Sequence, residues 1–355
     1  MLTLKHLLRA AVDQQASDLH LVAGAPPCLR VGGKVLRLKS DILQADDIKQ
    51  LVYAILTETQ KNTFEENKEL DFGIGIKDVS RFRGNICYQL GGIAAVFRRI
   101  PNDIPSLEKL NMPAVVSNFT QQKSGLVLVT GATGSGKTTT IAAMLDKINS
   151  EESATIVTLE DPIEYVHPHK KAIVKQREIG TDTDGFNVAL KHLLRQDPDY
   201  CLIGEMRDLD TIEAALKVAE TGHLVFATLH TNSAIETINR IIQAFPGGQQ
   251  ERVRVQLSFV LQGIISQQLL SSTDGALRLA LEVLVPTPGI RNLIREDKLH
   301  QIKSLMQMGQ NQTGMITMNQ SLMSLLLKRH IDMKTAFQSS PDPDELDRLL
   351  RKAGL

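Results

Sequence analysis

The chain of 355 residues has little of what several classes of protein depend on. Its three cysteines lie far apart and form no C-x-x-C pair, so we expect neither a disulfide scaffold nor a cysteine-rich zinc site, but a reducing cytoplasm. It has no tryptophan, and only 4% of its residues are aromatic. Lysine plus arginine and aspartate plus glutamate both number 40, so the formal net charge is zero. A protein that holds nucleic acid needs a basic excess and aromatic platforms, so we expect no nucleic-acid partner.

Long hydrophobic runs are also missing. The longest apolar-looking stretch, Val253 to Leu270, contains Arg254 and four glutamines, so the sequence predicts no membrane span. At the N-terminus, Lys5, Arg9 and Asp13 interrupt the hydrophobic residues on a helical period, which predicts a helix and no signal peptide. We therefore expect a cytoplasmic protein, one that is still able to dock peripherally on a membrane complex.

The chain length and a change of pattern near residue 100 predict two domains. Residues 1–100 predict a small α+β domain with an antiparallel sheet. It would contain an amphipathic N-terminal helix, a strand over Ser17–Leu21 and a helix over Asp47–Thr59. Glycine pairs at Gly32-Gly33 and Gly91-Gly92 separate alternating segments and predict two hairpins.

Residues 101–113 contain Pro101 and Pro105 and predict a linker, and residues 114–355 predict a larger α/β domain. In this part short apolar runs alternate with segments of helical period, which is typical of a parallel sheet covered by helices. Beyond Val285 the pattern is mostly helical. The four runs that we expect as strands are Leu126–Val129, Thr155–Leu159, Tyr200–Ile203 and Leu224–Thr228.

A phosphate-binding loop follows the first of these strands. Residues Gly131 to Thr138 match G-x-x-x-x-G-K-[ST], and the segment Thr139–Ile148 has the pattern of a helix. Glycines let backbone amides and the helix N-terminus face the phosphates of ATP. Lys137 would reach the β- and γ-phosphates, and the Thr138 hydroxyl would bind Mg²⁺. The residues assigned to the nucleotide are Gly131, Thr133, Gly134, Ser135, Gly136, Lys137, Thr138 and Thr139.

An ATPase of this kind also needs a carboxylate near the end of a neighbouring strand, to position Mg²⁺ and to activate water. The segment Tyr200–Glu205 fits in form, although Gly204 stands where an aspartate is frequent. Glu205 is therefore our expected general base and, with Thr138, our expected Mg²⁺ ligand. A second acidic cluster, Glu160-Asp-Pro-Ile-Glu164, ends another strand. For each of these acids, an exposed loop position without a catalytic role is the alternative.

Histidines bracket the strand Leu224–Thr228. His230, at its carboxyl end, is expected to sense the γ-phosphate or to link the site to the next subunit, with a satisfied strand-end histidine as the alternative. His223, at the far end, is expected to be structural or interfacial. His167 and His169 have no suitably spaced third ligand, so we expect no metal site there.

Taken together, four segments resemble the boxes of secretion and pilus ATPases, which are hexameric RecA-like motors. They are Thr130–Thr138, Leu159–Tyr165, Leu202–Asp208 and Thr221–Thr231. Ser17–Leu21 and Pro288–Glu296 narrow the resemblance to type IV pilus retraction ATPases. The resemblance implies a RecA-like ATPase domain preceded by a smaller PAS-like domain, with ATP and Mg²⁺ as cofactors. It also implies pilus retraction and twitching motility, and Glu164 as the acidic partner of the catalytic Glu205.

The resemblance further implies partners and contacts between subunits. We expect a homohexamer at the inner-membrane face, working with the pilus platform protein, the pilus base and a second retraction ATPase. The N-terminal domain of the family lends arginines to a neighbouring nucleotide, and Arg81, Arg83 and Arg98 on the second hairpin are our candidates. Arg81 and Arg83 share one strand face; a solvated strand face is the alternative. The family often carries a further arginine where Gln89-Leu90-Gly91 stands here.

The segment Pro288–Glu296 corresponds to the retraction box of the family, with Gly289 in the place of the usual alanine. On a helix its apolar residues would form a stripe that packs on the ATPase core, and Arg291 and Arg295 would lie on another face, free for a partner. A plain amphipathic surface helix is the alternative. The apolar residues are Ile290, Leu293 and Ile294.

Other functions remain in competition with retraction. A pilus-extension or type II secretion ATPase would share the four boxes, but such relatives are generally longer and often carry a tetracysteine module. A nucleic-acid translocase would share the RecA-like domain, but charge and aromatic content argue against it. An accessory retraction ATPase with little turnover is less compatible with an intact Lys137, Thr138 and Glu205.

Overall fold

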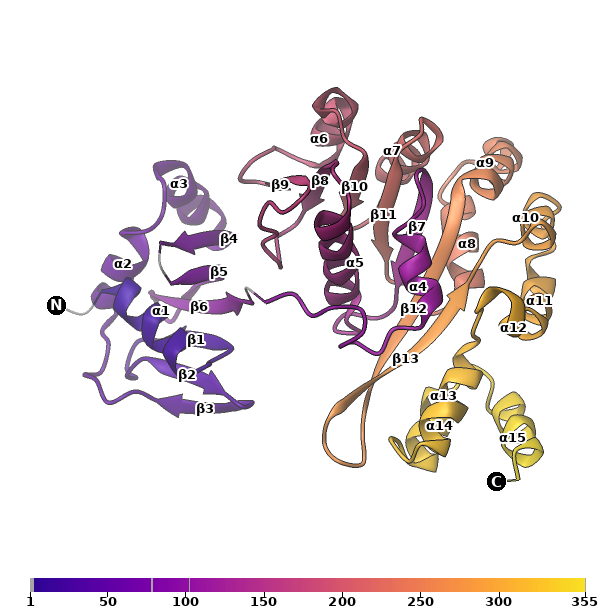
Figure 1. Cartoon of the computed structure of the whole chain (residues 1–355). Helices are drawn as coiled ribbons and strands as arrows, with labels where there is room; N and C mark the ends of the chain where they lie inside the picture. Colours follow the sequence, from indigo (N-terminus) through magenta and orange to yellow (C-terminus); the bar gives the residue numbers. More distant parts are fainter. Residues whose placement is uncertain (1–2, 78, 102, 355) are drawn as a thin grey trace. The chain divides into compact units, whose positions relative to one another are not determined.

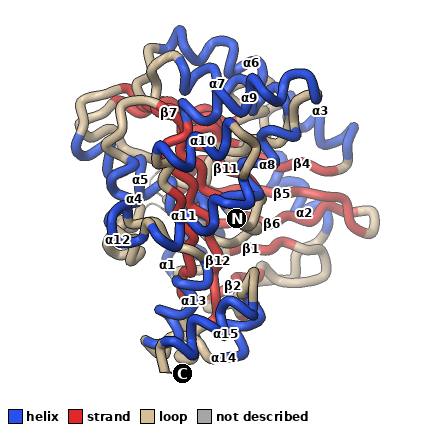
Figure 2. Tube along the Cα trace, turned by 90° about the vertical axis from the view of Figure 1, so that its right-hand side faces the viewer, coloured by secondary structure: helices blue, strands red, loops and turns tan. Residues whose placement is uncertain are grey.

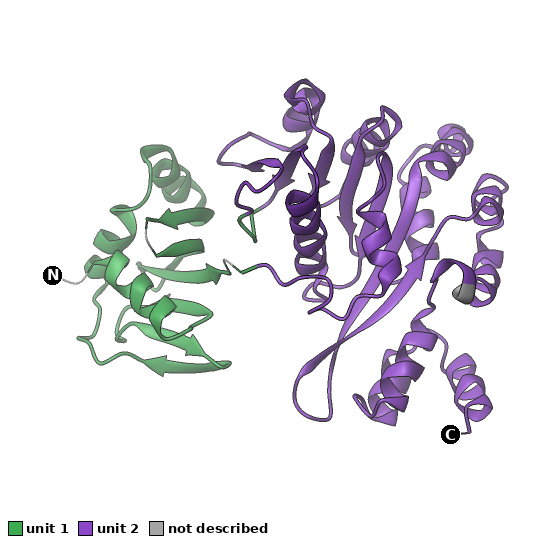
Figure 3. Ribbon diagram, in the orientation of Figure 1, with its two compact units in different colours: residues 1–103, 162–166 green, residues 104–161, 167–355 purple. Residues whose placement is uncertain are grey.

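The computed structural model describes residues 3–77, 79–101 and 103–354. The chain divides into two compact units (Figure 3). The first comprises Met1–Asp103 and Pro162–Val166, and the second comprises Ile104–Asp161 and His167–Leu355. The segment Pro162–Val166, which follows a strand of the second unit, thus groups with the first. The two units are described separately below, and the limits of the expected linker at 101–113 stay a prediction.

The first unit is built on a six-stranded antiparallel sheet with the order β3-β2-β1-β6-β5-β4 (Figure 1). Its helices pack on one face, because leucine, isoleucine and phenylalanine side chains of the helices and strands form a single buried cluster. The strands are β1 (Asp18–Leu21), β2 (Cys28–Val31), β3 (Lys34–Arg37), β4 (Glu69–Ile76), β5 (Ser80–Gln89) and β6 (Gly92–Ile100), and the helices are α1 (Leu4–Asp13), α2 (Ala45–Tyr53) and α3 (Glu58–Asn67). The expected N-terminal helix, first strand and two hairpins are confirmed.

The single helix expected over Asp47–Thr59 is wrong, because the chain forms α2 and α3 there. The reason is a capping box at Thr57. Its hydroxyl accepts a hydrogen bond from the backbone N–H of Gln60 at 3.3 Å, and its own N–H donates to the Gln60 side chain at 3.0 Å. Such reciprocal bonds satisfy the free amides of a new helix start, so the second helix begins at Glu58.

The second unit contains a seven-stranded sheet with the order β13-β12-β7-β11-β10-β8-β9, in which only the β12–β13 pair is antiparallel. The strands are β7 (Gly125–Thr130), β8 (Thr155–Glu160), β9 (Ile173–Glu178), β10 (Tyr200–Ile203), β11 (Leu224–Leu229), β12 (Leu261–Ser271) and β13 (Leu277–Leu284). The four strands expected from the sequence are confirmed. The strands β9, β12 and β13 were not predicted. The start of β12 was difficult to predict because this strand follows α9 directly at Val260, without a turn residue between them.

Helices cover both faces of this sheet (Figures 1 and 2). Alternate residues of the central strand β7 belong to two separate buried clusters: Leu126 and Leu128 pack with α7, α8 and α9, whereas Val127 and Val129 pack with α5. The helices up to this point are α4 (Ala114–Phe119), α5 (Lys137–Glu151), α6 (Phe186–Leu193), the short η1 (Leu194–Gln196), α7 (Leu209–Glu220), α8 (Ala234–Gln243) and α9 (Gly247–Val260).

The rest of the chain is helical, as expected. A small cluster that includes Leu270, Met318 and Leu346 joins the end of the β12–β13 hairpin to the last helices. The helices are α10 (Pro288–Arg295), η2 (Leu299–Gln301), α11 (Ile302–Met308), α12 (Gln310–Thr313), α13 (Met318–Leu327), α14 (Met333–Ser339) and α15 (Pro343–Lys352). In the described part of the chain, no helix combines the length and the apolar character that a membrane crossing requires.

Candidate active site

The expected strand–loop–helix unit is present at the centre of the second sheet. Strand β7 ends at Thr130, and α5 begins at Lys137. Gly134 and Gly136 adopt φ angles of +81° and +88°, which favour glycine. A Cβ atom on Gly131 would lie 2.3 Å from the carbonyl oxygen of Gln267 in β12, so only glycine fits there. The loop is therefore shaped by its own glycines and by a strand that follows more than a hundred residues later.

Lys137 is folded into this loop. Its ammonium group donates hydrogen bonds to the carbonyl oxygens of Gly131 at 2.7 Å and Ala132 at 3.0 Å, and the residue is buried. Thr133 and Gly134 are exposed at the loop tip, and Thr138 and Thr139 are partly exposed in the first turn of α5. The loop thus presents the start of a helix and a positive charge at one place, which is an arrangement suited to phosphate.

Glu205 follows β10 and is contacted by two cationic or titratable side chains. The Nε atom of Arg207 lies 2.8 Å from its Oε2 atom, and the Nε2 atom of His230 lies 3.2 Å from its Oε1 atom. The structure therefore brings together Glu205 and His230, both predicted, with Arg207, which was missed. Because β11 lies between β7 and β10, the phosphate loop, His230 and Glu205 stand at the carboxyl ends of three neighbouring parallel strands.

The unusual Gly204 has a steric explanation. A Cβ atom there would lie 3.0 Å from the carbonyl oxygen of Leu159 and 3.3 Å from the Cα atom of Glu160, tighter than side chains normally tolerate. The backbone of Gly204 also donates to Leu159 at 2.8 Å and accepts from the Thr228 hydroxyl at 2.5 Å. Glycine at this position lets the two acidic segments approach each other.

The three acids of the cluster after β8 have different surroundings. Glu160 is buried and accepts hydrogen bonds from Thr158 at 2.6 Å and Gln176 at 3.1 Å. Asp161 is exposed, and its Oδ2 atom lies 3.9 Å from Arg207. Glu164 is exposed and lies on the segment that groups with the first unit. Its catalytic role stays a prediction.

His223 and His167 have surroundings that differ from those of His230. His223 stands at the opposite end of β11, where its Nδ1 atom lies 3.1 Å from the Thr221 hydroxyl and 3.3 Å from the Val218 carbonyl oxygen. Burial lowers the pKa of His167 to about 4, so that imidazole is neutral at physiological pH. No group of three or more metal-ligating side chains occurs among the residues that the structure describes.

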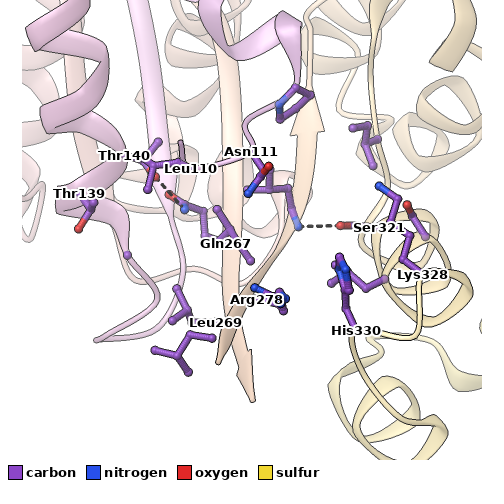
Figure 4. Close-up of a pocket in the computed structure, with 18 of the residues that line it drawn as sticks. Leu110, Asn111, Thr139, Thr140, Gln267, Leu269, Arg278, Ser321, Lys328 and His330 are labelled. Carbon is purple, nitrogen blue, oxygen red and sulfur yellow. Dashed lines mark hydrogen bonds between the residues drawn. The ribbon is translucent and has the colours of Figure 1, made fainter. Parts of the chain in front are cut away.

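A pocket of about 660 Å³ opens beside the first turns of α5 (Figure 4). Thr139, Thr140 and Leu269 line it, and Gln267 of β12 donates a hydrogen bond to the Thr140 hydroxyl at 3.0 Å. Lys328 lies at the side formed by α13. The pocket therefore offers apolar surface and polar groups directly next to the phosphate loop. No local sequence pattern predicts this pocket, because its walls come from segments that are distant in the sequence.

The three arginines predicted to act on a neighbouring subunit lie on one face of the first sheet. Arg83 and Arg98 are paired across β5 and β6, and Arg81 is two residues from Arg83 along β5. Their acidic partners differ. Arg98 Nε lies 2.8 Å from Asp18 Oδ1, whereas Arg83 Nε lies 3.8 Å from Asp71 Oδ1.

Helix α10 corresponds to the expected retraction-box helix, and its apolar stripe packs as expected, with Ile290 and Ile294 buried in the core. The expectation that Arg291 is free for a partner is wrong. Its guanidinium donates to the Pro286 carbonyl oxygen at 3.0 Å, to that of Phe259 at 2.9 Å and to Ser258. Arginine here satisfies free carbonyl groups at the end of α9.

Arg295 also packs on the end of α9. Its guanidinium carbon lies 5.8 Å from the centre of the Phe259 ring, and it donates to the Ser258 hydroxyl at 3.3 Å. Gly289 lies in the first turn of α10, where a Cβ atom would meet only Leu305 Cδ1 at 3.5 Å and Thr287 Oγ1 at 3.9 Å. The position therefore has room for the alanine that is usual in the family.

Comparison with known proteins gives consistent results. The family model described as "Type II/IV secretion system protein" matches residues 2–331. The type IV pilus retraction ATPase PilT of Pseudomonas aeruginosa is 47% identical over 338 residues, 95% of this chain and 98% of that protein. A twitching motility protein of Neisseria gonorrhoeae is 46% identical, over 90% of this chain and 86% of that protein. A crystal structure of the pilus retraction motor PilT with bound ADP superposes with a TM-score of 0.93 at 50% identity, covering 98% of this chain and 100% of that one.

Proposed function

Because the chain belongs to the family of type II/IV secretion system proteins, we propose that it is a homohexameric motor ATPase that drives type IV pilus retraction and twitching motility. The observation that carries the proposal is the meeting of the phosphate loop, Glu205 and His230 at the ends of three adjacent strands. The two-domain secretion ATPase fold, predicted from the sequence, agrees with it.

The residues of the loop fit a nucleotide with its Mg²⁺ ion. Lys137 would hold the β- and γ-phosphates, while the Gly131–Gly136 backbone and the start of α5 face the remaining charge. Thr138 has a partly exposed hydroxyl in the first turn of α5. Mg²⁺ is usually held by one or two protein oxygens together with phosphates and waters, so Thr138 and Glu205 suffice as protein ligands. The ion would supply charge neutralisation at the phosphates.

The chain's own side chains then carry the hydrolysis. Glu205 orients the attacking water and accepts its proton. His230, at 3.2 Å, holds one carboxylate oxygen of Glu205 and links it to the segment that leads into α8. Glu164 is the proposed acidic partner from the cluster after β8. Arg81, Arg83 and Arg98 of a neighbouring subunit would stabilise the charge of the transition state, which for arginine fingers is worth about 10³ to 10⁵ in rate.

The pocket beside α5 is the proposed place of the nucleoside. It begins at Gly136 and Thr139, which lie on the β12 side of the phosphate loop, opposite to Glu205 across β7. Leu269, Leu279 and Leu281 provide apolar surface for a base, and Gln267 and Asn111 provide polar groups. The base would thus lie on the β12 side of the phosphate loop, the phosphates at the end of β7, and the attacking water beside Glu205 at the end of β10.

We place the hexamer in the cytoplasm, peripheral to the inner-membrane face of the pilus machine. Its partners there would be the platform protein, the pilus base and a second retraction ATPase. These assignments extend from the similarity to pilus retraction proteins. Because α10 uses its arginines to hold the end of α9, the retraction box would transmit motion through the core, and direct binding of a partner by Arg291 is not expected.

The decisive experiment compares Glu205→Gln with wild type. Binding of a fluorescent ATP analogue should stay within about twofold, and phosphate release should fall by at least roughly 10²-fold, because the substitution removes the proton acceptor and keeps the size. Glu213→Gln is the matched control, because this acid on α7 pairs with Lys217 at 2.9 Å on the surface. Unchanged turnover in Glu205→Gln would reject the proposed base.

The motor function is tested in cells whose own retraction ATPase has been deleted. Expression of the wild-type chain should restore shrinking of fluorescently labelled pili and spreading on agar, and expression of Glu205→Gln should not. Pili that retract equally with either protein would show that hydrolysis by this chain does not drive retraction.

A further inference from the structure

Four charged residues form a row across the open face of the first sheet. Asp18 of β1 is paired with Arg30 of β2 on one side and with Arg98 of β6 on the other. Arg83 of β5 continues the row, since it is paired with Arg98. Residues that are directly opposite in neighbouring strands project from the same face of a sheet. One carboxylate therefore lies between two guanidinium groups.

Asp18 is firmly held in this row. It is only 3% exposed, and its carboxylate accepts hydrogen bonds from the Ser17 hydroxyl and from Arg98 Nε, each at 2.8 Å. Arg30 Nε lies 3.6 Å from the other side of the carboxylate. Burial acts to raise the pKa of Asp18, but the hydrogen bonds from Ser17 and Arg98 outweigh it, and the pKa is lowered. A buried charge of this kind is tolerated only with its partners in place.

The Nε atom of Arg98 is held by Asp18, whereas the rest of its guanidinium group is available to a ligand. Its Nε atom binds Asp18, yet 68% of its side chain is exposed. No hydrogen bond of the described residues uses its two terminal nitrogens, which are the pair that binds a phosphate or carboxylate bidentately. Arg30 is also tied down, because its terminal nitrogen donates to the Gly33 carbonyl oxygen at 3.0 Å. The carboxylate balances one of the two guanidinium charges, so the row keeps a positive excess.

The neighbouring pair of Arg83 and Asp71 provides a contrast. Its distance is 3.8 Å, and the Asp71 side chain is 60% exposed. Ion pairs of this kind on the surface contribute little and fix little geometry. Of Arg83 and Arg98, Arg98 is thus the one whose direction is set by a buried group.

We infer that Asp18 is a positioning residue that aligns Arg98, with Arg30 beside it, as a preorganised fork for a phosphate group of the nucleotide on a neighbouring subunit. The inference rests on the proposed function, in which these arginines act between subunits. It adds two residues, Asp18 and Arg30, to which the sequence analysis gave no role. Preorganisation of donors toward developing charge lowers the cost of reaching the transition state.

The test begins with Asp18→Asn, which keeps the shape and removes the charge that holds the guanidinium. Turnover by the assembled protein should fall by roughly 10²-fold, the scale expected for misplacing a catalytic group by about an ångström. Binding of the fluorescent ATP analogue should stay within about twofold. Asp71→Asn, the matched control, should retain turnover within about twofold. Wild-type turnover in a folded Asp18→Asn variant would overturn the inference.

Mixed hexamers separate a positioning role from a general loss of structure. Asp18→Asn subunits carry an intact Glu205, and Glu205→Gln subunits carry an intact row, so a mixture should regain part of the activity that neither has alone. Combining Asp18→Asn with Arg98→Ala should cost no more than Arg98→Ala, because both changes remove the same aligned group. A mixture without any recovery, or fully additive losses, would contradict the proposed role of Asp18.

A second variant covers the case in which Asp18→Asn does not fold. Arg98→Lys keeps the charge on an exposed side chain but has neither the Nε anchor nor the fork, so it should lose nearly as much turnover as Arg98→Ala; wild-type turnover would overturn the inference. Mixing Arg98→Ala with Glu205→Gln tests the underlying function separately. Failure of that mixture rejects donation of Arg98 to a neighbouring subunit. Recovery in that mixture together with wild-type turnover of Arg98→Lys rejects only the fork.

Discussion

The two sheets of this molecule place functional side chains in different ways. In the antiparallel sheet of the first unit, buried and partly exposed residues alternate along β5, and the open face carries arginines in the middle of strands. In the second unit, β7 and β11 are buried at every position. The two proposed catalytic side chains, Glu205 and His230, lie instead in the segments that follow the strands.

The difference follows from what covers each sheet. Helices on both faces of a parallel sheet leave its strand interiors without access to solvent, so chemistry is restricted to the carboxyl edge. A sheet that is covered on one face exposes every second side chain. Changes inside strands should therefore affect stability in the second unit and activity in the first, and the following predictions test this rule.

The largest effect is expected for Lys137→Ala at the strand edge. Loss of the ammonium group from the phosphate loop should lower turnover by roughly 10³-fold and weaken ATP binding. Lys147→Ala is the control, because this lysine lies on the same helix and pairs with Glu151 at 2.5 Å, outside the phosphate loop. Phosphate release and nucleotide titration measure the outcome. A fully active Lys137→Ala protein would show that ATP is not hydrolysed at this phosphate loop.

The next effect concerns strand interiors. Phe226 lies in the middle of β11 and is fully buried, so Phe226→Ala should lower the free energy of unfolding by about 3–5 kcal/mol. Arg83→Ala on the open face of β5 should change it by less than about 0.5 kcal/mol while slowing turnover. Denaturant unfolding of both variants checks the contrast. Equal losses of stability would break the rule.

A smaller effect is expected at Gly204, between the two acidic segments. Gly204→Ala should cost about 1–2 kcal/mol of stability, because the new methyl group forces the Leu159 carbonyl or the backbone of Glu160 to move. Turnover should fall as well, since Glu205 is the next residue. Gly247→Ala at the start of α9 meets no atom within 4 Å and serves as the control. Thermal unfolding in which Gly204→Ala is neutral would contradict the steric explanation.

The smallest effect is expected for Gly289→Ala in α10. The site has room for a methyl group, and alanine favours helix over glycine, so stability should rise by less than about 1 kcal/mol. ATPase activity should not change. A lower melting temperature would show that the first turn of α10 is more tightly packed than these distances indicate.

Local sequence patterns were sufficient to predict several parts of the structure. The phosphate loop, the four central strands and the hairpins of the first unit depend on glycine positions and on periodicity within short segments. Periodicity alone did not separate helix α3 from α2. The residues of the capping box, Thr57 and Gln60, are a sequence signal that could have predicted its start. Arg207 could have been noticed as a cation two residues after Glu205, but no pattern showed that it would turn back toward the carboxylate.

Other features depend on segments that are distant in the sequence. The turn of the phosphate loop is confined by Gln267, and the pocket beside it is formed by β12, β13 and α13. The anchoring of Arg98 requires Asp18, eighty residues earlier in the chain. The hydrogen bonds of Arg291 depend on the end of α9, which the pattern of α10 alone does not reveal.

The phosphate loop between a buried strand and a helix could be predicted from the residues alone, because glycine geometry and helix periodicity act over a few residues. The choice of acids and histidines at the neighbouring strand ends depends on the order of the strands in the sheet. Along the chain β8 follows β7, but in the sheet β11 and β10 lie between them. Strand order is set by packing of the whole core, so the strands that precede His230 and Glu205 lie between β7 and β8 in the sheet.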